Sequence, residues 1–129
     1  MATHKLTIAV EGSGISLTRD ISETGTGVVL IDGETVADSV TDQVCNIDLD
    51  VSAVKSFYIV SDQNITVETN AVDATGGNTL SLIAGEPYIW HVSSLDSFLL
   101  TQDVTIAYLT NASGSTATVY CVACYDASP

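Results

Sequence analysis

Basic residues are scarce in this chain. Lys5, Arg19 and Lys55 are its only lysines and arginine, against sixteen aspartates and glutamates, and the formal net charge is −13. Proteins that bind DNA or RNA need lysine and arginine to displace counterions from phosphates. We therefore expect no nucleic-acid partner. The acidic residues are spread along the chain instead of forming one block, which indicates a solubilising surface.

Long apolar runs are missing as well. No run approaches the ~20 residues that a membrane-spanning helix needs, so we expect no membrane partner. The first residues alternate polar and apolar side chains and contain no signal-peptide core, so we expect synthesis and retention in a cytoplasm. A chain of 129 residues is long enough to fold as one domain without a disulfide or a metal ion.

Helical periodicity is nearly absent, and a period-two alternation of apolar and polar residues takes its place. Turn-forming clusters of Gly, Asn, Asp and Pro separate the alternating segments at the spacing of a sandwich. We predict an all-β protein, a single-domain antiparallel β-sandwich that is jelly-roll-like and covers residues 1–129, with Met1–His4 as the natural place for an N-terminal arm. The expected strands are 5–11, 15–22, 27–32, 34–40, 45–51, 55–61, 64–69, 79–84, 87–92, 103–111 and 116–125, with helical turns near 51–54 and 93–97.

The apolar face of these strands predicts the core. The expected core residues are Leu6, Ile8, Leu17, Ile47, Leu49, Phe57, Ile59, Val67, Leu82, Trp90, Ile106 and Val119.

Cysteine is limited to three residues, two of which form a C-x-x-C at Cys121 and Cys124. On a strand, residues three apart point to opposite faces and lie about 10 Å apart, too far for a disulfide or a shared metal ion. A zinc site would need further ligands, and Cys45, His4 and His91 form no second ligand pair. We expect three thiols without a disulfide or metal.

Catalytic patterns are equally sparse. Histidine occurs only as His4 and His91, and no G-x-S-x-G nucleophile elbow is present. Asp48 and Asp50 would share one strand face and in principle suit a glycosidase, but solvated alternation explains them better, and aromatic residues, which line such clefts, make up only 6%. We expect no enzymatic activity, no catalytic residues and no cofactor.

Calcium is harder to exclude. The acidic segments 32–34 and 70–73 supply oxygen ligands, although no EF-hand or repeat pattern accompanies them.

Three segments are apolar on both strand faces: 57–60, 106–109 and 119–125. A sandwich in water buries only the inner face of each sheet, so something must cover the outer face. Either the segment 96–101 folds over it or a neighbouring subunit does. The predicted oligomer or partner interface consists of Tyr58, Val60, Tyr108, Tyr120, Val122 and Cys124.

Trp90 and His91 form the other notable pair. An aromatic side chain beside a histidine could line a ligand pocket, and this is the alternative interpretation of the pair. A small sandwich often centres its core on one tryptophan, so we favour Trp90 as a core residue, with His91 as an ordinary outward residue.

Three segments carry a resemblance to a known group. They are 50–63, with F-x-I-x-S-D; 82–90, with L-x-A-G-x-P before an aromatic; and 109–119, with T-N-A-S-G-S-T-A. Over about residues 50–125 the chain resembles small β-sandwich virion proteins of tailed bacteriophages. These motifs describe strands and turns and transfer no functional residue.

The resemblance implies a capsid decoration or cement protein. Such a protein would be made in the host cytoplasm, would sit on the outer capsid surface of the virion as a homo-oligomer, commonly a trimer, and would bind the major capsid protein. A carbohydrate- or ligand-binding sandwich, for example in a tail or fibre apparatus, remains the alternative.

Overall fold

The structure of the protein is a computed structural model that describes residues 2–72 and 76–126. Its strands and one short 3-10 helix, η1, follow one another as β1 (Ala2–Gly12), β2 (Ile15–Gly25), β3 (Gly27–Val36), β4 (Gln43–Cys45), η1 (Val51–Ala53), β5 (Val54–Ser61), β6 (Ile65–Thr69), β7 (Thr79–Leu82), β8 (Tyr88–His91), β9 (Ala107–Thr110) and β10 (Ala117–Tyr125).

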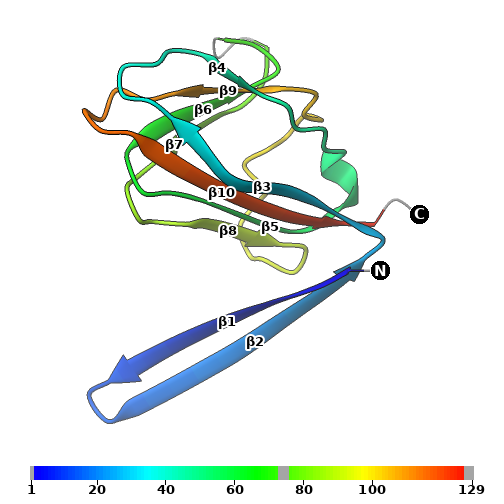
Figure 1. Cartoon of the computed structure of the whole chain (residues 1–129). Helices are drawn as coiled ribbons and strands as arrows, with labels where there is room; N and C mark the ends of the chain where they lie inside the picture. Colours follow the sequence, from blue (N-terminus) through cyan, green and yellow to red (C-terminus); the bar gives the residue numbers. More distant parts are fainter. Residues whose placement is uncertain (1, 73–75, 127–129) are drawn as a thin grey trace.

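The strands from β3 to β10 form two packed sheets, ordered β3-β10-β5-β8 and β4-β9-β6-β7 (Figure 1). The first of these strands pairs with the last, β3 with β10, and the pairing then nests inward as β4 with β9, β5 with β8 and β6 with β7, always antiparallel. This is the arrangement of a long antiparallel ribbon rolled into two sheets, which is a jelly roll. The predicted all-β sandwich is confirmed.

The core lies between the two sheets. Alternate residues of β5 and β10 point inward, as in Phe57 and Ile59 or Val119 and Cys121, and are at most 3% exposed. Of the predicted core residues, Leu49, Phe57, Ile59, Val67, Leu82 and Val119 are buried, while Ile47 and Trp90 are partly buried and pack against them.

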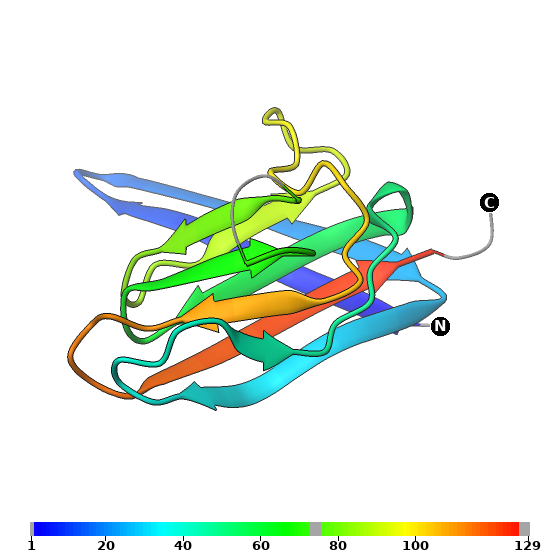
Figure 2. The same ribbon diagram turned by 90° about the horizontal axis from the view of Figure 1, so that it is seen from above.

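The first two strands stand outside the sandwich. β1 and β2 pair along their whole length, from Ala2 opposite Gly25 to Gly12 opposite Ile15, and form a two-stranded sheet of their own. We call this hairpin, residues 2–25, the arm. Figures 1 and 2 show the arm leaving the sandwich next to β3 and running obliquely past the sheet β3-β10-β5-β8.

Four predicted core positions are wrong, three of them because they lie on the arm. Ile8 is 46% and Leu17 64% exposed on the arm, and Leu6, also on the arm, is only partly buried. Alternation shows that one strand face differs from the other, but it does not show that anything covers the apolar face. Ile106 precedes β9 and lies outside the core cluster.

Several predicted boundaries also differ. The expected strands 27–32 and 34–40 are interrupted at Gly33, yet β3 runs through this residue. Asp32 faces Tyr120 and Glu34 faces Val119, so Gly33, at φ 79°, is the extra residue of a β-bulge. Glycine with positive φ serves bulges as well as turns. The strand expected at 45–51 ends at Cys45, and the helical turn expected at 93–97 is a run of turns and bends.

The N-terminal arm expected at Met1–His4 is part of a longer element. Met1 lies outside the described residues, and Thr3 and His4 pair within β1 opposite Thr24 and Glu23. The element that projects from the sandwich is the whole hairpin.

Candidate functional site

The outward side of the sheet β3-β10-β5-β8, here called the outer face, is largely apolar. Strand register places Leu30, Val122, Tyr58 and Ile89 in one row across its four strands. Side chains on opposed strand positions lie on the same face of a sheet. Leu30 remains 60% exposed, so this row presents apolar surface that the sandwich itself does not bury.

Five of the six residues of the predicted interface lie on this outer face. Tyr58 and Val60 point outward from β5, and Tyr120, Val122 and Cys124 point outward from β10. The structure therefore brings together residues sixty or more positions apart in the sequence.

Tyr108 does not belong to this group. It lies on β9 between Val44 and Glu68, on the other sheet of the sandwich. Segment 106–109 is apolar on both strand faces, but this pattern does not show to which sheet the segment belongs. The predicted interface therefore combined residues from the outer faces of two different sheets.

Of the two covers predicted for the outer face, the segment 96–101 is wrong. Segment 96–101 instead closes the side of the sandwich: Phe98 packs against the core and Leu100 is buried in it. The arm is what crosses the outer face. Ile21, near the end of β2, is buried there at 8% exposure. At Gly25 the arm lies so close to β10 that the Cβ of any replacing residue would be 2.2 Å from the carbonyl oxygen of Tyr125.

Between the arm and the outer face lies a cleft of about 390 Å³. Its arm side is formed by residues 3–6, Ile21 and Glu23, and its sandwich side by residues of β5, β8 and β10. Leu6, Ile21, Tyr58, Ile89 and Val122 make most of this lining apolar.

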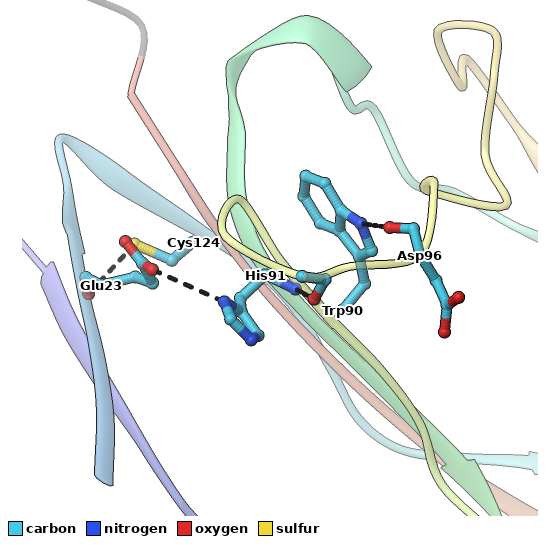
Figure 3. Close-up of polar contacts among 6 residues, drawn as sticks. Glu23, Trp90, His91, Asp96 and Cys124 are labelled. Carbon is cyan, nitrogen blue, oxygen red and sulfur yellow. Dashed lines mark hydrogen bonds and ion pairs between the residues drawn. The ribbon is translucent and has the colours of Figure 1, made fainter. Parts of the chain in front are cut away.

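His91 is not the ordinary outward residue that the sequence suggested. Its side chain is 12% exposed under the arm, and its Nδ1 lies 3.9 Å from Oε1 of Glu23, whose side chain is 18% exposed (Figure 3). No hydrogen bond to Nδ1 is formed within the described part of the chain. The backbone N–H of His91 donates to Ser94 Oγ at 2.9 Å, which fixes the end of β8.

Trp90 is the core tryptophan that the sequence predicted. Its ring stacks on Phe98 with centroids 4.3 Å apart and planes 11° apart, and its Nε1–H donates to the Asp96 carbonyl at 3.1 Å. Phe57 and Tyr88 complete the aromatic cluster. Trp90 also lines the cleft together with His91, so the residues of the predicted ligand pocket do meet at one cavity.

The two thiols of the C-x-x-C lie on opposite faces, as the strand geometry predicts. Cys121 points into the core, and burial raises its pKa to about 12, with Cys45 as a further cause. Cys124 points to the outer face, where its Sγ lies 3.9 Å from the carbonyl oxygen of Glu23. Burial also raises the pKa of Cys124, with Glu23 and Asp126 adding to the shift.

The remaining candidates for chemistry have structural roles. Asp50 Oδ1 accepts from the Ser52 hydroxyl at 2.6 Å and from the Ser52 N–H at 3.0 Å, which caps η1 and lowers the pKa of Asp50. Asp48 lies outside any strand, so the two carboxylates do not share a strand face.

The two acidic segments considered for calcium differ in what the structure shows of them. Segment 32–34 belongs to β3 instead of a loop, and Asp73 of segment 70–73 lies outside the described residues. No three Asp, Glu, His or Cys side chains gather as a metal site in residues 2–72 and 76–126.

The arm and Glu23 are what the sequence analysis missed. A signal was present, because the two strands of equal length joined by Gly12-Ser-Gly14 read as an autonomous hairpin. Glu23 is a polar residue on the strand face that also carries Leu17 and Ile21, and it lies where the arm contacts His91.

Comparison with known proteins adds no relative, since no protein-family model, curated protein or solved structure matches the chain. In the part of the chain that the structure describes, no helix is both long and apolar enough to cross a membrane.

Proposed function

We propose that this chain is a non-enzymatic structural protein of a phage virion, a decoration or cement protein that oligomerises on the outer head surface and binds the major capsid protein. The observation that carries the proposal is the apolar outer face, which the arm covers only in part. Large exposed apolar patches on small domains mark protein interfaces. Leu30, Tyr120 and Val28 stay 60%, 46% and 40% exposed there.

The architecture and charge support this proposal. Jelly rolls recur in viral capsid proteins, where broad, rigid faces pack against neighbours. A net charge of −13 opposes contact with packaged DNA, so an outward position on the head suits the chain better than an inward one.

The test is the protein content of purified phage particles. Quantitative mass spectrometry should find the chain at a fixed, near-integer ratio to the major capsid protein, and mild denaturant should release it while the shell stays closed. Absence from particles, or a trace amount with no fixed ratio, would overturn the proposal.

A carbohydrate- or ligand-binding module is the second candidate, and the cleft beside Trp90 and His91 favours it. Pockets lined by apolar groups with a few polar atoms are the usual form of small-molecule sites. Isothermal titration with a panel of mono- and oligosaccharides should show saturable heat that His91→Ala abolishes if this candidate is correct. A flat titration across the panel, with the chain present in particles, leaves the structural function.

A further inference from the structure

We propose that the arm is an exchange element: the apolar stripe at its tip packs on the exposed part of the outer face of a second copy of this chain. This inference rests on the self-association contained in the proposed function and names the surfaces that produce it. It does not require the capsid.

The arm has one apolar and one polar face. Register places Val10 opposite Leu17 and Gly12 opposite Ile15, with Ile8 next along the same face, whereas Thr7 and Asp20 hydrogen-bond on the other face. The tip stripe consists of Ile8, Val10, Ile15 and Leu17, which are 46%, 61%, 55% and 64% exposed. A two-stranded hairpin with an uncovered apolar face is marginally stable in water, so the tip stripe needs a partner surface.

The part of the arm next to the sandwich, which we call its root, shows which surface fits the tip stripe. The same stripe continues through Leu6 and Ile21, and there it lies over Tyr58, Ile89 and Val122 of the outer face. Farther out the arm diverges from the sheet (Figure 1), so the tip stripe does not reach the outer face of its own sandwich.

The outer face has a matching uncovered part. We call Leu30, Val60 and Tyr120 the receiving strip: they lie together where β3, β10 and β5 are adjacent, and Leu30 and Tyr120 are exposed. Next to the sandwich, the apolar face of the arm already packs on the outer face of the same chain. The tip stripe and the receiving strip continue these two apolar surfaces, but within one chain they do not touch. A second copy therefore supplies the missing half of both surfaces.

The exposed areas are of the order that a stable contact needs. Taking about 60–120 Å² for each fully exposed side chain, the tip stripe and the receiving strip together offer roughly 200–440 Å² of apolar surface per copy. A standard interface buries about 800 Å² per partner, of which about 60% is apolar. When every copy gives one arm and receives one, the exchange approaches the apolar area of a standard interface.

Charge favours the same pairing. Arg19 lies on the apolar face of the arm opposite Ile8, and no ion pair joins it to any residue in the ranges 2–72 and 76–126. Asp32, beside Tyr120, lies exposed at the edge of the receiving strip. In a chain with a net charge of −13, an arginine on one copy next to an aspartate on the other reduces the repulsion between copies.

The experiment compares two interface variants with matched controls, using size-exclusion chromatography with light scattering over a dilution series. Leu17→Asp alters the tip stripe, and Thr18→Asp places the same charge on the polar face of the same strand. Leu30→Asp alters the receiving strip, and Val44→Asp alters the exposed surface of the other sheet. We expect the first variant of each pair to weaken association at least about 30-fold, or about 2 kcal/mol, and both controls to match the wild type.

Mixing the two variants tests the exchange itself. The intact arm of the Leu30→Asp variant fits the intact receiving strip of the Leu17→Asp variant. An equimolar mixture should therefore form a heterodimer at concentrations where each variant alone stays monomeric. If only Leu17→Asp dissociates, the tips contact each other and the inference is wrong. Association that survives both substitutions also overturns it.

Failure of this inference is distinguishable from failure of the proposed function. A wild-type chain that is monomeric at every concentration refutes the exchange. If it is nevertheless recovered from particles and Leu17→Asp is not, the tip stripe binds a capsid subunit, and the virion function stands without the exchange. An exchanging oligomer that is absent from particles supports the inference and refutes the virion function.

Discussion

His91 Nδ1 on β8 lies 3.9 Å from Glu23 Oε1 on β2, and this contact joins the arm to the edge of the sandwich. The two residues are 68 positions apart, and both side chains are largely covered. Because the arm touches the sandwich mainly near its root, a contact placed there determines how firmly the whole hairpin is held.

Replacing His91 with Ala should loosen the arm without unfolding the sandwich. The loss of one partly buried polar contact costs about 1 kcal/mol, so amide hydrogen exchange in β1 and β2 should accelerate about fivefold while β5 and β10 stay protected. Leu95→Ala, at a fully exposed position, is the control. Equal acceleration in the arm and the sandwich would mean that His91 stabilises the fold as a whole.

Gly25→Ala should displace the root of the arm. The new Cβ would lie 2.2 Å from the Tyr125 carbonyl oxygen and 3.0 Å from Cys124 Sγ, and backbone atoms cannot retreat cheaply. We expect faster proteolysis at the junction near Thr26 and a loss of about 1–3 kcal/mol in the free energy of unfolding. Thr24→Ala, on the exposed polar face, should leave both measurements near wild type; an unchanged proteolysis rate for Gly25→Ala would contradict the packing described.

Trp90→Ala should cost about 3–5 kcal/mol in urea denaturation, because it removes the ring that packs on Phe98 at the side of the core. Phe98→Ala should show a smaller additional loss in the Trp90→Ala background than alone, since stacked partners are not additive. Strict additivity would show that the stacking contributes nothing beyond burial.

Cys121 should stay unreactive in the folded protein. Burial raises its pKa to about 12, so at pH of about 8 the thiol is protonated and a disulfide reagent should titrate it only after unfolding. The folded pKa of Cys121 lies above its unfolded value of about 8.5. Its contribution to the free energy of unfolding is therefore complete below pH of about 8.5 and is lost as the pH rises toward about 12.

Replacing Cys121 with Ala should therefore flatten the alkaline fall in unfolding free energy relative to the wild type. Rapid labelling of Cys121 in the native state would contradict its burial. Intact mass under non-reducing denaturing conditions checks the related expectation that the chain carries three thiols and no disulfide.

Much of the sandwich follows from alternation alone. Phe57, Ile59, Val119 and Cys121 alternate with outward residues over strands whose ends are marked by Gly, Asn and Pro, and local spacing is enough to assign their faces. The same reasoning separates the two thiols of the C-x-x-C.

Local sequence patterns do not predict which strands are neighbours in a sheet. The assignment of Tyr108 to the wrong surface and of Leu17 to the core both arise from this limit, because a period of two identifies a face but not the element that covers it. The bulge at Gly33 shows the same limit, since one glycine conformation serves two kinds of structure.

The sequence by itself determined the β class, the inward and outward residues of most sandwich strands and the acidic charge, because these depend on neighbours two positions away and on composition. Only the tertiary structure decided that the first two strands leave the sandwich as an arm, that His91 lies against Glu23, and that Leu30 shares a face with Tyr58 and Tyr120 while Tyr108 does not. Those relationships depend on pairing between distant segments, where the gain from long-range burial must outweigh the entropy of closing long loops, and no local pattern records which pairing achieves that.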